Sequence, residues 1–137
     1  MQAFLEEAKR SSRTIANLST AVKNKVLNEM ADALMNHCDF IISHNEKDMM
    51  DARVNNLSES LQDRLLLTGQ RVKDMADAIR QIASQLEPVG RILDGWVTKD
   101  GLNIQKVSIP IGVIGIIYES RPNVTSDTAA LCFKSGN

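Results

Sequence analysis

Hydrophobic positions in the first 88 residues recur every three or four residues, the spacing of amphipathic helices. A first helix should end before Ser19 or Thr20, either of which can cap the next helix. That second helix is predicted to be long, with His44 at its C-terminus, where a cationic side chain is favoured. Its predicted apolar stripe comprises Val22, Val26, Met30, Ala33, Leu34, Cys38, Ile41 and Ile42.

Three further helices are expected before residue 88. Asn45 is predicted to cap a short helix that ends near Arg53, and Ser58 restarts a helical turn after the Asn55-Asn56 break. Thr68 should cap a longer helix, which Pro88 stops because the residue before a proline disfavours helical geometry. Its predicted buried face comprises Val72, Met75, Ala76, Ile79, Ile82, Ala83 and Leu86. We interpret residues 1–88 as a helical scaffold.

The period of the pattern changes between residues 89 and 110. Two turn signals, Asp94-Gly95 and Asp100-Gly101, interrupt a run of extended, largely β-prone residues. A turn at Asp100-Gly101 would pair residues 96–99 with residues 102–105. An isolated hairpin is only marginally stable, so this ribbon is expected to need a partner surface.

Residues 111–118 form the run IGVIGIIY, which is apolar at both alternating sets of positions. Such a run predicts a strand buried inside a parallel sheet. The polarity then inverts through residues 119–123, and the group Thr125, Ser126 and Asp127 offers cap and first-turn chemistry for a short helix. Gly136 follows at the left-handed C′ position, and the predicted apolar face of this helix is Ala130, Leu131 and Phe133.

A strand followed by a polar loop and a helix N-terminus predicts a ligand site in an α/β sheet, because ligands bind outside the carboxyl ends of parallel strands. Backbone N–H groups at the helix start would favour an anionic group.

Composition narrows the candidate functions. The net charge of -1 and 43% hydrophobic residues predict a cytoplasmic globular chain without nucleic-acid or membrane partners. Nothing resembles a leader sequence, and no apolar run is long enough to span a bilayer. Cys38 and Cys132 are expected to be reduced, half-buried thiols, and the spacing of His37 and His44 does not favour a metal site.

Two long runs carry a resemblance to a known family. They are PIGVIGIIYESRPNVT (110–125) and AALCFKSGN (129–137), with looser support from HNEKDM, DRLLLT and EPVGRIL upstream. The chain resembles the glutamyl-phosphate reductases (glutamate-5-semialdehyde dehydrogenases), a branch of the aldehyde dehydrogenase superfamily. The resemblance implies an α/β fold, in which residues 1–137 are the N-terminal part of the cofactor-binding domain and the catalytic domain is absent. Residues 1–88 would be the helical scaffold, 89–110 an oligomerisation hairpin and 111–137 the first strand, loop and helix of the dinucleotide-binding fold.

The same resemblance implies NADPH-dependent reduction of L-glutamyl 5-phosphate to glutamate 5-semialdehyde in proline biosynthesis, through a cysteine thioester. Neither cysteine here suits that role, so the nucleophile should lie outside this chain, which alone should be inactive. Asn123 is the candidate oxyanion donor. The loop residues Tyr118, Glu119 and Ser120 would border the nicotinamide and its ribose. Arg121 is our own inference: its guanidinium suits either the substrate carboxylate or the phosphate.

Alternatives stay open at this level. Asn123 could merely shape a turn, and Arg121 could form a structural ion pair with Glu119 or another acid. The whole chain could be a non-catalytic helical module that associates through its hairpin. It could also be the reductase part of a fused pyrroline-5-carboxylate synthase.

Overall fold

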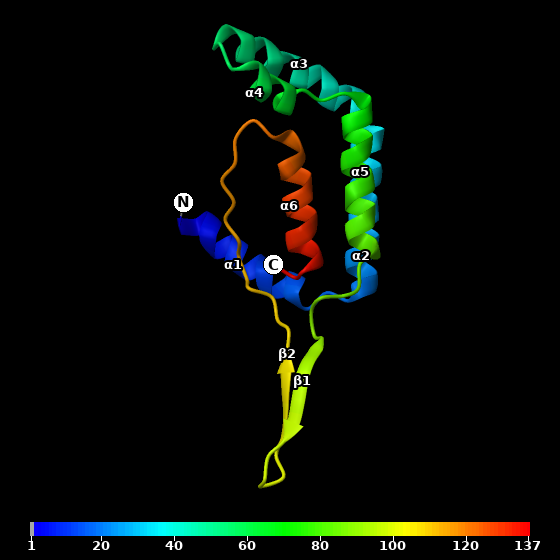
Figure 1. Cartoon of the computed structure of the whole chain (residues 1–137), viewed down its shortest axis with the longest axis vertical. Coiled ribbons are helices and arrows are strands. Elements are labelled where there is room, and N and C mark those ends of the chain that lie inside the picture. The colour runs from blue at the N-terminus through cyan, green and yellow to red at the C-terminus, as the bar shows by residue number, and fades with distance from the viewer. Residues whose placement is uncertain (1) are drawn as a thin grey trace.

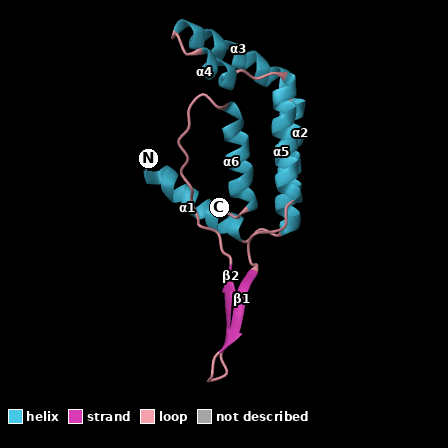
Figure 2. Cartoon of the chain, in the orientation of Figure 1, coloured by secondary structure: helices cyan, strands magenta, loops and turns pink. Residues whose placement is uncertain are grey.

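The computed structural model describes residues 2–137, and within them six helices and one antiparallel pair of strands form (Figures 1 and 2). The elements in chain order are α1 Gln2–Ala16, α2 Thr20–Asn36, α3 Cys38–Val54, α4 Glu59–Leu65, α5 Gly69–Ser84, β1 Ile92–Val97, β2 Asn103–Val107 and α6 Pro122–Lys134. The predicted caps Ser19, Ser58 and Thr68 are confirmed, since each side-chain oxygen accepts a first-turn backbone N–H. Over the described residues, no helix is both long and apolar enough to cross a bilayer.

The core lies where α2 and α5 pack together and α6 packs against both of them; Figure 1 shows α6 beside the α2–α5 pair. The predicted buried face of α5 is confirmed except at Leu86, which follows the helix and is 80% exposed. For α2 the predicted stripe is rotated: Val22 is exposed, and its neighbour Lys23 is buried instead. The principal core cluster comprises Leu27, Ala31, Ala76, Ile79, Ile82, Ala83 and Ala130. Small residues at several of these positions let the helices approach closely.

The boundary between α2 and α3 differs from the prediction. The long helix breaks at His37, and α3 then continues through both His44 and Asn45. The predictions that His44 ends a helix and that Asn45 begins one are therefore wrong. Asn45 is buried inside α3, where its amide donates to the Leu65 carbonyl and its oxygen accepts the Leu67 N–H. These tertiary hydrogen bonds satisfy a polar side chain that locally favours a cap.

The predicted hairpin is confirmed and projects away from the helices (Figure 2). Trp96 pairs with Ile104 across the two strands, and Gly101 has a φ of +82° in the connecting turn. The second turn signal, Asp94-Gly95, makes no turn: it lies within β1, next to an irregularity of register. Every residue of β1 is exposed.

The predicted strand at residues 111–118 is wrong for this chain. The segment forms neither strand nor helix and runs as an extended loop beside α6 (Figure 2). Ile111 is 86% exposed and Ile117 is fully exposed. A strand exists only where neighbouring strands accept and donate its backbone hydrogen bonds, and among residues 2–137 the only strand pairing joins β1 and β2.

The helix after this loop begins earlier than predicted. Pro122 occupies the first turn of α6 and Arg121 is its N-cap, so the predicted cap residues 125–127 lie inside the helix. Asn123 is consequently a helix residue and not a loop residue. The predicted left-handed Gly136 is confirmed, with a φ of +77°. A Cβ there would approach the Pro110 ring to 2.9 Å, so the site excludes other residues on space as well.

Candidate functional site

A cleft with a volume of about 480 Å³ opens where α4 and α5 face the start of α6. Its position follows from the helix boundaries above, because α6 begins at Pro122 and ends against α2 and α5. The lining residues are Asp63, Arg64, Leu66, Leu67, Arg71, Asp74, Met75, Ala78, Arg121, Pro122, Asn123 and Asp127. Three arginines and three aspartates therefore meet in one concave surface.

The structure brings two of the predicted site residues, Arg121 and Asn123, together in this cleft. Arg121 is exposed and forms no salt bridge within residues 2–137, with Glu119 or with any other acid. The Asn123 amide donates to a carboxylate oxygen of Asp127 at 3.0 Å, one turn along α6. One amide hydrogen is thus committed, and the second remains for a ligand.

The other three predicted residues lie in the loop before α6 and do not line the cleft. The Tyr118 hydroxyl and the Thr125 hydroxyl are 2.5 Å apart, which ties the loop to α6. Glu119 is exposed. Ser120 has a φ of +49°, a left-handed conformation that is uncommon outside glycine, asparagine and aspartate. The turn at Ser120 immediately precedes Arg121 and so directs the chain into the cleft.

The opposite wall of the cleft, formed by α4 and α5, was not predicted from the sequence. Arg71 donates to the Asp63 carboxylate and to the Leu66 carbonyl, both at 2.8 Å, and to the Asp63 carbonyl. These bonds lock the end of α4 onto the start of α5. No periodicity connects residues of two different helices, so neither Arg71 nor its neighbour Arg64 could be assigned to a site from spacing.

Asp127 was also missed, because its position suggested only capping chemistry. Its Oδ2 accepts from Asn123, whereas its Oδ1 is shielded from solvent and has no hydrogen-bond partner among the described residues. A shielded carboxylate oxygen without a donor is energetically costly. The only advance signal was the spacing of Asn123 and Asp127, four residues apart, which places them on one helix face.

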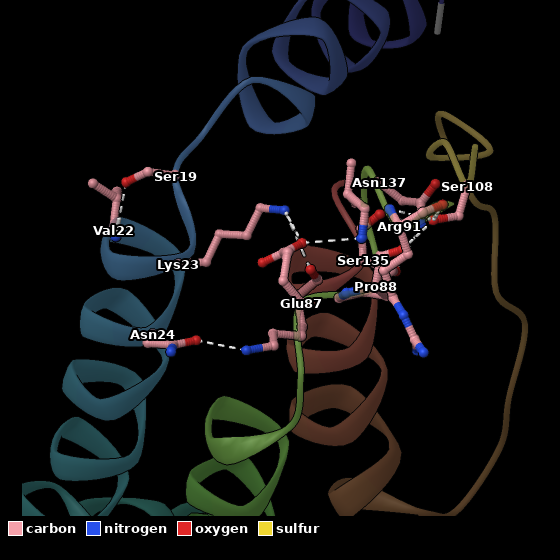
Figure 3. Close-up of polar contacts among 12 residues, drawn as sticks. Ser19, Val22, Lys23, Asn24, Glu87, Pro88, Arg91, Ser108, Ser135 and Asn137 are labelled. Atoms are coloured by element: carbon pink, nitrogen blue, oxygen red, sulfur yellow. Dashed lines mark hydrogen bonds and ion pairs between the residues drawn. The ribbon is translucent and has the colours of Figure 1, made fainter. Parts of the chain in front are cut away.

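A buried polar cluster holds the other end of α6 against the scaffold (Figure 3). Lys134 is 2% exposed and donates to the Asn24 side chain at 2.6 Å and to the Ala83 carbonyl at 2.9 Å. Lys23 is 1% exposed and pairs with Glu87 at 2.8 Å. Burial by itself would raise the pKa of Glu87, but hydrogen bonds from Lys23 and the Val89 amide hold this pKa below its usual value. The cluster fixes where α6 lies, and with it the cleft.

Both cysteines are half-buried free thiols, and neither lines the cleft. Cys38 lies at the start of α3 and Cys132 near the end of α6, facing α1. The cleft therefore collects charged and amide side chains without a sulfur nucleophile from the described residues.

Comparisons with known proteins establish the family. No family model matches the chain. The gamma-glutamyl phosphate reductase of Aliarcobacter butzleri is 78% identical over all 137 residues, and that of a Sulfurovum species is 64% identical over the same length. The chain belongs to the gamma-glutamyl phosphate reductase family. It spans 33% of the length of each of these two relatives.

Solved structures agree with this assignment. Gamma-glutamyl phosphate reductase from Thermotoga maritima matches with a TM-score of 0.92 at 41% identity, over 96% of this chain and 32% of that one. The Saccharomyces cerevisiae protein of the same name matches with a TM-score of 0.92 at 32% identity, over 96% of this chain and 34% of that one. The mixed α/β arrangement is thus that of the gamma-glutamyl phosphate reductases, and the predicted fold class is confirmed.

Proposed function

We propose that this chain is the N-terminal portion of a reductase that converts L-glutamyl 5-phosphate to glutamate 5-semialdehyde in proline biosynthesis. The observation that carries the proposal is 78% identity, across every residue of the chain, to a gamma-glutamyl phosphate reductase. The cleft supports it, because Arg121 and Asn123 line a surface suited to an anionic substrate with a reacting carbonyl.

The proposed reaction needs groups that the described residues do not supply. A thiolate displaces phosphate from the acyl phosphate to form a thioester, and hydride addition then releases the aldehyde and regenerates the thiolate. Cys38 and Cys132 lie outside the cleft, so the nucleophile belongs to another part of the reductase and these 137 residues alone should be inactive. The second Asn123 amide hydrogen would donate to the thioester oxyanion, and Arg121 would bind the substrate.

NADPH is the proposed cofactor, and when bound its nicotinamide supplies the hydride. The loop chemistry fits this role, since Tyr118 and Glu119 are exposed and the Ser120 hydroxyl forms no hydrogen bond within the described residues. Hydroxyl and carboxylate groups are suitable partners for ribose hydroxyls. We assign these three residues to the border of the nicotinamide riboside. We also propose that the enzyme is cytoplasmic.

The test replaces the corresponding third of the Aliarcobacter butzleri reductase with this sequence. The hybrid should oxidise glutamate 5-semialdehyde with phosphate and NADP⁺, forming the acyl phosphate and NADPH, whose absorbance is followed. An inactive but folded hybrid would contradict the proposal. In the active hybrid, Arg121→Ala should chiefly raise KM for the semialdehyde, and Asn123→Ala should lower kcat roughly 100-fold or more with little change in KM. Arg53→Ala, an exposed change at the far end of α3, is the matched control.

We also propose that the hairpin joins copies of the enzyme. Trp96, Val97 and Leu102 are all more than half exposed on a two-stranded ribbon, which is marginal without a partner. Trp96→Ser with Val97→Ser in the hybrid should lower its mass in sedimentation. A non-catalytic assembly module is the competing function, and it predicts concentration-dependent assembly of the 137-residue chain itself with no nicotinamide binding.

A further inference from the structure

The charges of the cleft are only partly neutralised by one another. Arg71 and Asp63 form a 2.8 Å ion pair. Arg64 and Arg121 form no salt bridge with any described residue, and the Asp127 carboxylate receives a single neutral donor, the Asn123 amide. Apart from the Arg71–Asp63 ion pair, the cleft therefore still contains both cationic and anionic side chains.

Among the charged side chains of the cleft, Asp127 has an oxygen that lacks a hydrogen-bond donor. Asn123 holds Oδ2, while Oδ1 is shielded from bulk water and has no donor among the described residues. No described residue donates to this oxygen, so the carboxylate retains acceptor capacity for a group that enters the cleft. The terminal torsion of an aspartate is soft, so either oxygen can turn toward such a donor. A cationic donor fits best, since a carboxylate hydrogen-bonds most strongly to a charged partner.

Arg121 supplies the complementary group. It is the N-cap of α6, and Asp127 lies near the second turn of the same helix, so one rigid element carries both charges. Neighbouring ammonium and carboxylate groups are the defining feature of a free α-amino acid. A fork-shaped guanidinium accepts the carboxylate bidentately, and an aspartate accepts the ammonium.

We propose that this cleft recognises the α-amino acid end of the substrate, with Asp127 binding the α-ammonium group and Arg121 the α-carboxylate. The inference rests on the proposed reductase function and assigns Arg121 to the carboxylate and not to the phosphate. The phosphate end must face a nucleophile that the described residues do not provide, so we assign Arg121 to the opposite, amino-acid end of the substrate. Asn123 then has a second task, because its hydrogen bond orients Asp127.

The decisive variant is Asp127→Asn, which keeps the shape and the oxygen that accepts from Asn123 but removes the charge. In the hybrid reductase, KM for glutamate 5-semialdehyde should rise about 10- to 100-fold. Activity on 5-oxopentanoate, which lacks the amino group, should be unchanged. Asp48→Asn, on an exposed face of α3, is the matched control and should change neither substrate's KM.

Equal losses on both substrates would show that Asp127 serves only the fold, and an unchanged KM on both would also overturn the inference. A binding measurement keeps the test independent of turnover: calorimetric titration of the hybrid with L-glutamate and with glutarate. The unmodified hybrid should prefer glutamate, and Asp127→Asn should abolish that preference. A hybrid that binds glutamate selectively but is inactive would contradict the proposed reductase function alone, whereas an active hybrid without that selectivity would contradict this inference alone.

Discussion

Two segments whose sequence patterns predict burial have opposite fates in this chain. In α5, Ala76 and Ile79 are completely buried in the core that α5 forms with α2 and α6, and Val72 is completely buried in a second cluster with residues of α2 and α3. In the loop before α6, Ile111 and Ile117 are exposed to solvent. A helix satisfies its backbone hydrogen bonds internally and needs only one apolar face covered. A buried strand needs neighbouring strands for its backbone hydrogen bonds and other elements to cover its faces, so its own sequence cannot form a strand without them.

The largest expected effect comes from the same substitution made in each segment. Ile79→Ala empties part of the core and should lower the free energy of unfolding by about 2–5 kcal/mol. Ile117→Ala removes a side chain that contacts mostly water and should change it by less than about 0.5 kcal/mol. Urea unfolding of the 137-residue chain, followed by circular dichroism, measures both. Similar losses at the two positions would mean that the loop is packed and that the contrast is false.

A second variant tests whether the scaffold depends on tertiary polar contacts as well as apolar ones. Asn45→Ala leaves the buried Leu67 N–H without its 2.7 Å acceptor and should cost about 1–3 kcal/mol of unfolding free energy. Asn28→Ala is the matched control, because Asn28 is exposed and bonds only within α2. Equal stability of the two variants in the same urea titration would show that the α3–α4 connection does not depend on this bridge.

The smallest expected effect is on the pH dependence of stability. Because the pKa of Glu87 lies below its ordinary value of 4.5, its ion pair should stabilise the chain fully at neutral pH. That contribution is lost as the pH falls below 4.5 and through the lower pKa of the folded state. Glu87→Gln should therefore flatten the loss of melting temperature as the pH falls below 4.5. Glu46→Gln, on an exposed face of α3, is the control; a pH dependence unchanged by Glu87→Gln would contradict the assignment.

Part of the candidate site could be predicted from the sequence. Asn123 was identified through the family resemblance and Arg121 from its guanidinium chemistry in the loop before a predicted helix, and both line the cleft. Asp127 and Arg71 were not, because their roles depend on which helix face meets which. The prediction that Asn123 lies in a loop was also wrong, because α6 begins at Pro122, ahead of Asn123 and of the predicted cap residues 125–127. Local signals such as caps and prolines constrain single elements, whereas clefts arise between elements.

By itself the sequence determined the helical scaffold, three N-caps, the hairpin turn at Asp100-Gly101 and the family. The scaffold, the caps and the turn depend on periodicity, on short-range hydrogen bonds and on backbone preferences, all of which act over a few neighbouring residues, whereas the family follows from two long sequence runs. Only the tertiary structure decided that Lys23 lies inside, that Asn45 bridges two helices and that residues 111–118 stay unpaired. Burial and strand pairing are set by partners distant in the chain, and a local pattern carries no information about whether those partners are present.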